Sequence, residues 1–173
     1  MIRTAGPVDA AALATLAAAT FPLACPPDAS PAAIADFIAT QLAEANFARY
    51  LADPARQILI AELDGLPSGY TMLVFAEPTD PDVLAAVTAR PTAELSKCYV
   101  LASAHGTGLA AELMAATLEA ARARGAAGVW LGVNNENAKA NRFYEKSGFA
   151  RVGDKRFLLG DRWEEDFVRE VVL

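Results

Sequence analysis

Two glycines separated by one residue stand in the segment His105-Gly106-Thr107-Gly108-Leu109-Ala110. An apolar, strand-like run precedes this segment, and an alanine-rich stretch with apolar residues at helical spacing follows it. A tight turn in this place presents several backbone N–H groups, together with the positive end of a helix, to an anion. The segment therefore indicates a seat for a phosphate group, although a G-x-G pair taken alone more often serves only as a turn.

Two common phosphate-binding motifs do not fit these glycines. The P-loop requires Lys-Ser or Lys-Thr after its glycines, and neither follows Gly108. The dinucleotide fingerprint G-x-G-x-x-G/A finds Ala111 at its last position, which could pass. It also requires an acidic residue at the end of the next strand, where Val133 and Asn134 stand.

A second cluster, residues 137–149, follows one helix and one strand later. Tyr144 lies on its predicted helix. Tyr144 also shares a helical face with Ala140 and Ser147, so taken alone it is better explained as a core aromatic. Asn137 could likewise serve only as a helix N-cap. The two clusters together indicate an enzyme that binds a phosphorylated cofactor.

Alternating strand and helix signals predict the scaffold for both clusters. The predicted strands are residues 1–4, 57–63, 70–75, 94–101, 129–133, 149–159 and 163–173. The predicted helices are residues 8 to about 22, a helix from 31 that 46–50 extend, 109–124 and 138–147, with one helical turn at 83–87. We expect a single α/β domain, residues 1–173, with a mixed, mostly antiparallel sheet of six or seven strands and helices on both faces.

Composition limits the class of partner. The 173 residues carry a formal net charge of −6, which argues against nucleic acid and suits a cationic small molecule, although acidity for solubility alone explains it as well. His105 is the only histidine, and Cys25 and Cys98 form no C-x-x-C pair, so a disulfide framework or metal site is not expected. We find no leader pattern at the N-terminus and expect no membrane-crossing run. The protein is expected to be cytoplasmic, with a homodimer left open.

The two clusters together resemble the GNAT superfamily of N-acetyltransferases. Residues 100–110 are similar to its acetyl-coenzyme A loop, whose pattern is Gln or Arg, two residues, Gly, one residue, and Gly or Ala. His105 stands where Gln or Arg is usual, and Ala110 is an accepted variant. Asn137, Ala140 and Tyr144 follow the N-x-x-A-x-x-x-Y pattern, and residues 143–149 resemble its F-Y-x-x-x-G-F ending. The similarity covers roughly residues 94–173, and the N-terminal half fits the fold only in outline.

The resemblance implies acetyl-CoA as co-substrate, no metal, and a role for each matching position. The strands at Val100 and Val133 are expected to splay where the cofactor arm enters. Backbone groups of Cys98, Tyr99 and Val100 would hold the pantetheine arm and thioester. Asn137 would contact the same arm, and Tyr144 would bind there and give a proton to the departing thiolate. The pyrophosphate would rest on the amides of His105, Gly106, Thr107, Gly108, Leu109 and Ala110.

Acidic residues are candidates for handling the amine. An ammonium must lose a proton before its nitrogen can attack, and Glu94 is the first candidate to take it, directly or through water. A surface strand carboxylate explains Glu94 equally well. A second acidic group could attract a cationic amine, although an ordinary solvated turn accounts for it better; its members are Asp161, Glu164, Glu165 and Asp166.

The acceptor is the least defined part of the prediction. The branch that acetylates protein N-termini often carries a glutamate on the strand before Asn137, whereas Gly132 stands here. Residues 130–133 and 157–161 with Asp166 resemble instead the bacterial polyamine (spermidine/spermine) N-acetyltransferase branch, with Arg156 in place of an expected histidine. We expect direct attack by a small-molecule primary amine in a ternary complex; alternatives are a protein N-terminus, lysine, amino acid or antibiotic. An acyl-CoA sensor without turnover and a nucleotide-binding protein of another fold are the competing hypotheses.

Overall fold

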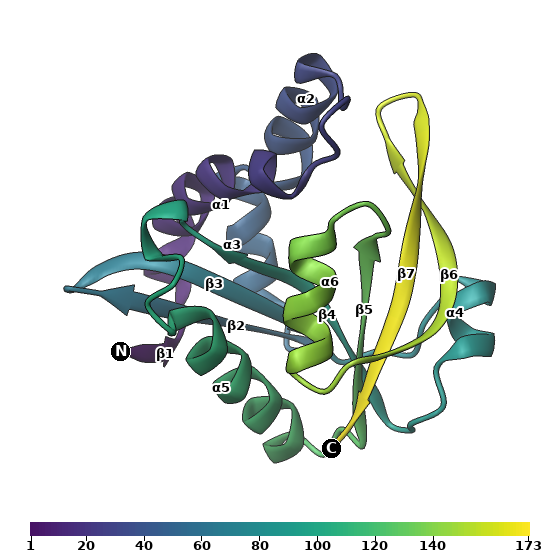
Figure 1. The fold of residues 1–173 in the computed structure, drawn as a ribbon. Helices are drawn as coiled ribbons and strands as arrows, with labels where there is room; N and C mark the ends of the chain where they lie inside the picture. Colours follow the sequence, from purple (N-terminus) through teal and green to yellow (C-terminus); the bar gives the residue numbers. More distant parts are fainter.

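A computed structural model describes residues 1–173 and confirms the predicted α/β class. Its seven strands form one mixed sheet in the order β1-β2-β3-β4-β5-β7-β6, in which only β4 and β5 pair in parallel (Figure 1). The strands are β1 Ile2–Thr4, β2 Arg56–Leu63, β3 Leu66–Val74, β4 Thr92–Val100, β5 Gly128–Asn134, β6 Ala150–Leu159 and β7 Arg162–Val172. The helices are α1 Ala10–Ala24, α2 Pro31–Gln41, α3 Glu44–Ala52, α4 Pro81–Ala86, α5 Leu109–Ala123 and α6 Ala138–Lys146, with short 3-10 turns at Pro7–Asp9 and Ala102–Ala104.

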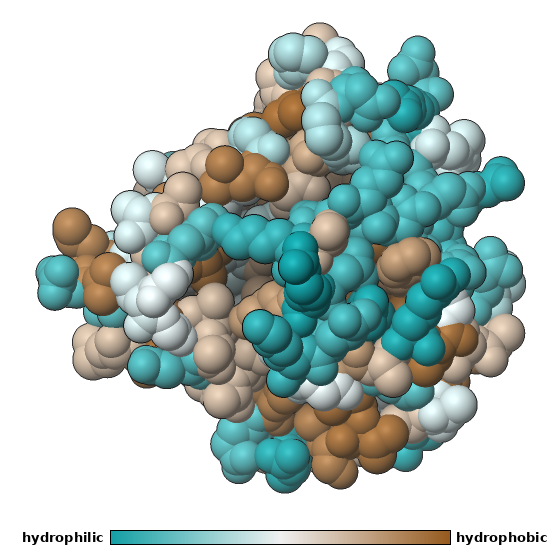
Figure 2. Space-filling view, in the orientation of Figure 1, coloured by the Kyte–Doolittle hydropathy of each residue, from teal (hydrophilic) through white to brown (hydrophobic).

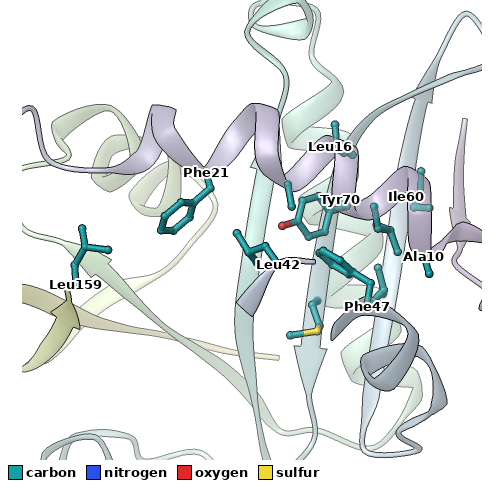
Figure 3. Packing of buried hydrophobic residues seen from close by; sticks show 12 residues of the cluster. Ala10, Leu16, Phe21, Leu42, Phe47, Ile60, Tyr70 and Leu159 are labelled. Carbon is teal, nitrogen blue, oxygen red and sulfur yellow. The ribbon is translucent and has the colours of Figure 1, made fainter. Parts of the chain in front are cut away.

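Helices cover both faces of the sheet, as predicted. The alternation of β2 shows how: Ile58 and Ile60 pack in the core under α1 and α3, while Leu59 packs on the opposite face with residues of α5. Phe47 of α3 and Tyr70 of β3 meet edge to face beneath α1, with ring centroids 5.7 Å apart (Figure 3). The larger apolar cluster therefore fixes α1 and α3 on the face that will hold one half of the site.

Local signals placed most elements correctly. Ser30 caps α2 by accepting from the Ala33 N–H, with Pro31 at the first helical position. Asp64 and Gly65 have φ of +53° and +78°, the two left-handed residues that a tight β2–β3 hairpin requires.

Three details differ from the prediction. Residues 46–50 do not extend α2: the chain turns out of the helix at Leu42, and α3 starts anew after Ala43, which has extended backbone. Pro22 does not end α1, because it lies in the last turn and deprives only the exposed Ala18 of a partner. The helical turn expected at residues 83–87 belongs to a helix that begins earlier, at Pro81 behind the capping side chain of Asp80, and ends at Ala86.

The first helical stretch is more apolar than expected. Pro7–Ala24 spans 18 residues with a mean hydropathy of 1.4. By length and composition alone it could cross a membrane, so the expectation that no run is apolar enough is wrong. In the fold, this stretch contributes Leu13, Leu16 and Ala17 to the core against the sheet.

The sheet opens in its middle. β4 and β5 pair only through Thr92↔Gly128, Ala93↔Val129 and Glu94↔Trp130, after which the strands diverge. The divergence is the splay predicted from the sequence, and α6 lies over it (Figure 1). β4 stays paired with β3 up to Val100, so its edge toward β5 is open beyond Glu94. The open edge is where the candidate residues gather.

Candidate active site

Two pockets meet at the divergence of β4 and β5. The larger cleft has a volume of about 320 Å³ and lies between α1, α2 and the strands β4–β7. The smaller pocket, about 190 Å³, lies between α1, β4 and α6, where Figure 2 shows the surface hollowed. Both pockets are lined by Cys98, Tyr99, Asn137 and Tyr144. They are therefore two ends of one passage through the opened sheet.

The glycine turn lies at the outer end of the smaller pocket, which His105 and Ala110 line. Gly106 and Gly108 have φ of +81° and +89°, and the N–H groups of Gly106, Gly108 and Ala110 find no acceptor in the chain. These free donors at the start of α5 fit an anion. The Thr107 hydroxyl is not free to bind an anion, because it donates to the Ala104 carbonyl and accepts from the Leu109 N–H.

A lysine from α6 adds positive charge to the turn. Lys139 Nζ lies 2.8 Å from His105 Nδ1, and His105 Nε2 lies 3.2 Å from the Val100 carbonyl oxygen. The carbonyl requires a donor, so Nε2 carries the proton and Nδ1 accepts from the lysine. His105 thus holds Lys139 beside the free amides, and sequence reasoning missed this lysine.

β4 presents alternate side chains to the two faces of the sheet. A bulge falls between its pairs with Met72 and Leu73, and the extra residue is Ser96. Beyond the bulge, Lys97 and Tyr99 face α1 and α3, and Cys98 faces α6. The backbone of Cys98 to Val100 forms part of the open edge, as the resemblance requires for a strand-like ligand.

Tyr144 of α6 and Cys98 of β4 face one another at the junction of the pockets. Burial disfavours the phenolate and raises the pKa of Tyr144 well above its usual value, so the phenol stays protonated at neutral pH. Burial also raises the pKa of the Cys98 thiol to about 12, so little nucleophilic thiolate forms. Asn137 lines both pockets and also caps α6, accepting from the Ala140 N–H at 3.0 Å.

A buried arginine anchors α6 to the sheet. Arg169 of β7 donates from Nε to Asn141 Oδ1 at 2.9 Å, from one terminal nitrogen to the Phe149 carbonyl at 3.2 Å, and from the other to Glu145 at 2.8 Å. Asn141 in turn donates to the carbonyls of Asn134 and Asn137. Sequence reasoning missed this network, because its members lie on separate elements and form no local motif.

The larger cleft contains both carboxylates and ammonium groups. Glu94 is half-buried, and burial raises its pKa against the opposing pull of Lys155, Lys97 and Arg56. Burial raises the pKa of Asp166 to about 6, although Lys155 Nζ lies 3.8 Å from its Oδ2. Burial lowers the pKa of Lys97 to about 8, with Glu94 opposing the shift. Sequence reasoning did not find Lys97 and Lys155.

The four acidic residues expected to act together are separated by strand alternation. Glu164 and Asp166 are buried and line the larger cleft, whereas Asp161 and Glu165 face solvent. Glu165 lies 3.6 Å from Arg156, which is also outside the cleft. Only two members of this group can therefore meet a substrate in the cleft.

Aromatic rings close the far end of the larger cleft. Phe21 of α1 stacks on Phe37 of α2 with centroids 4.5 Å apart, and Phe157 of β6 meets Phe37 edge to face at 5.9 Å. The cleft thus combines a charged floor with an apolar end, which suits an amine carried on a short hydrocarbon chain.

Comparison with known proteins agrees with the fold and gives the family. Residues 17–149 match the acetyltransferase (GNAT) family, and the chain belongs to this family. It is an N-acetyltransferase. The chain is 49% identical over 166 residues to an uncharacterized N-acetyltransferase of Mycobacterium tuberculosis, covering 95% of this chain and 99% of that one.

Solved structures of low sequence identity share the fold. The PaiA N-acetyltransferase of Thermoplasma acidophilum, solved in complex with coenzyme A, has a TM-score of 0.78 and 18% identity, covering 100% of this chain and 98% of that one. The ribosomal-protein-alanine N-acetyltransferase of Brucella melitensis has a TM-score of 0.75 and 24% identity, covering 100% and 99% of the two chains.

Proposed function

We propose that this protein transfers the acetyl group of acetyl-CoA to a small primary amine, by direct attack with both substrates bound. One observation carries the proposal: a turn with three free N–H groups and a protonated tyrosine stand at successive points of one passage, which ends in a cleft with carboxylates. Acetyl-CoA supplies the activated thioester. The chain has to seat the coenzyme, align the amine and move protons.

The smaller pocket fits the coenzyme. The free N–H groups of Gly106, Gly108 and Ala110, with Lys139 beside them, would hold the pyrophosphate by charge-assisted hydrogen bonds. The open edge of β4 would accept the amide-containing arm as an additional strand. The arm would then run toward Cys98, where the Tyr144 hydroxyl can give a proton to the leaving sulfur.

The larger cleft fits the amine. Its carboxylates include Glu94, expected from the sequence to take the proton of the ammonium, together with Glu164 and Asp166. A polyamine is one acceptor that we propose, because its methylene groups match the aromatic end and its ammonium groups match the carboxylates. The high pKa of Cys98 disfavours a covalent acetyl-cysteine and supports direct attack.

Release of the coenzyme thiol tests the proposal. The purified protein is incubated with acetyl-CoA and a panel of polyamines, amino acids, aminoglycosides and peptides, and free thiol is recorded for each. Transfer to one amine class identifies the acceptor. Coenzyme binding without thiol release from any amine would contradict the proposal and favour a sensor.

The Tyr144→Phe variant tests the acid. Loss of a general acid lowers turnover by about 100-fold or more, while the dissociation constant of coenzyme A should change little. Tyr50→Phe is the matched control, because the Tyr50 hydroxyl only donates to the Gln41 carbonyl outside the passage. Unchanged turnover of Tyr144→Phe at saturating substrates would remove the assigned role.

A further inference from the structure

Gly132 has no side chain and so leaves a hollow in β5, on the floor of the larger cleft, that side chains of neighbouring strands can enter. It is exposed on β5, between the buried residues Leu131 and Val133. A Cβ atom at this position would come within 2.5 Å of Lys155 Cε and 3.2 Å of Asp166 Oδ2. Side chains from β6 and β7 thus occupy the space that a β5 side chain would take.

The Asp166 carboxylate lies beyond the closed end of the opening between β4 and β5, where the reaction is expected. β4 and β5 last pair at Glu94↔Trp130, and Cys98 lies four residues farther along β4; one of these is the bulge residue Ser96, so the advance is about three steps of 3.3 Å, or about 10 Å. The Asp166 backbone pairs with Asn134, four residues beyond Trp130 on β5, and its carboxylate lies beside Gly132, two residues beyond Trp130. Glu94, in contrast, stands at the closed end of the opening, where the two strands are still paired.

We propose that Asp166 takes the proton from the acceptor ammonium, and that Gly132 is the residue that admits its carboxylate to the cleft. The proposal rests on the proposed acetyl transfer and assigns its base. Asp166 and Tyr144 line the same cleft, so an amine bound there can lose a proton to one while the sulfur gains a proton from the other.

The proton balance requires two transfers from nitrogen. The ammonium gives its first proton to the Asp166 carboxylate, which passes it to water, and the freed lone pair forms the C–N bond. The C–S bond breaks with its electron pair on sulfur, and Tyr144 protonates the sulfur. The nitrogen then gives its second proton to the Tyr144 phenolate. The products are the N-acetyl amine, free coenzyme thiol and one proton released to water.

The charges around Asp166 support its use at neutral pH. Burial raises its pKa to about 6; Lys155 from β6 lowers the value, and Glu164 and Glu165 from β7 raise it. Tyr99 of β4 faces the carboxylate from across the cleft. The carboxylate is therefore ionised at pH 7 and still basic enough to accept a proton, which is the compromise that general base catalysis requires.

Three variants test the assignment through the pH dependence of kcat/KM. Wild-type activity should fall below about pH 6 as Asp166 becomes protonated. Asp166→Asn should lose about 100-fold at pH 7, and its deficit should shrink as the pH approaches the pKa of the acceptor amine, which then arrives already neutral. Glu94→Gln should keep the acidic limb, which is the fall in kcat/KM below about pH 6. Lys155→Met should move that limb to higher pH, because an opposing positive charge is removed.

The outcomes separate this inference from the proposed function. Absence of thiol release from the wild-type protein would remove the proposed function itself. An active wild type with an Asp166→Asn deficit that stays equal at every pH would show a binding or structural role and overturn the inference. An acidic limb lost in Glu94→Gln and kept in Asp166→Asn would assign the base to Glu94. Coenzyme affinity and thermal unfolding of each variant confirm that the fold is kept.

Discussion

Replacing Gly132 by alanine tests the hollow in the cleft by itself, because the substitution removes no polar or charged group of the site. The added methyl group would lie 2.5 Å from Lys155 Cε, 3.2 Å from Asp166 Oδ2 and 3.4 Å from Lys155 Nζ. The nearest of these atoms is near the end of a flexible side chain, which can move away. The carboxylate has to give way by a few tenths of an ångström or more once the lysine leaves its place.

The expected effect is large on activity and small on stability. A misplacement of about 1 Å can cost about 100-fold in rate, so Gly132→Ala should lower kcat by about 10- to 100-fold. The free energy of unfolding should change by less than about 1 kcal/mol, because alanine adapts to strand geometry at least as well as glycine and the nearest displaced atoms belong to a flexible lysine side chain.

Steady-state thiol release and urea unfolding of the same preparations measure both quantities. Gly153→Ala is the control with the opposite expectation. Its Cβ would lie 2.7 Å from Ala86 Cβ of α4, and neither residue lines the cleft, so it should lose stability and keep its kcat when folded. Full activity of Gly132→Ala would refute the idea that the hollow positions the carboxylate.

Three further changes have expected outcomes. Arg169→Met leaves the buried acceptors of the α6 anchor unsatisfied and should lower the free energy of unfolding in urea by about 2–4 kcal/mol. Gly108→Ala, at a φ of +89°, should weaken coenzyme binding in calorimetry about 10-fold through strain of about 1–2 kcal/mol in the turn, whereas Gly125→Ala, at +84° after α5, should destabilise the protein without that loss. Asp166→Asn should be more stable than wild type at pH 8 by up to about 3 kcal/mol in urea. Burial raises the pKa of Asp166 from 3.8 to about 6, so wild-type stability falls as pH rises through that window, and the difference should vanish near pH 3.

Local chemistry explains why much of the fold could be predicted from the sequence. A capping serine before proline at residue 30, the Asp64-Gly65 turn and the alternation of β2 each act within a few residues, and each had its expected effect. The start of α3 could not be predicted from the sequence. It depends on the end of α2 at Leu42, whose side chain is buried in the core under α1. Burial against an element that is distant in the sequence leaves no pattern in the few residues around the buried side chain.

The residues of the candidate site likewise fall into those that local sequence patterns predict and those that depend on distant elements. The glycine turn, Asn137 and Tyr144 belong to short contiguous patterns, and the structure brings them to one passage. Lys155 comes from the partner strand of β7, and its place over Gly132 depends on register across the sheet. Register between distant strands is set by the whole sheet, so the charge balance of the cleft could only be seen in three dimensions.

The three residue pairs between β4 and β5 are the only ladder that joins the two halves of the sheet. A ladder this short gives little protection to the amides on the open edge of β4, so these amides should exchange with deuterium within a short time in the free protein. A coenzyme arm seated as an additional strand would slow that exchange and raise the thermal unfolding temperature of both halves together. The sheet should therefore be stiffer when the coenzyme is bound in the passage. It should be most flexible when the passage is empty, between one catalytic cycle and the next.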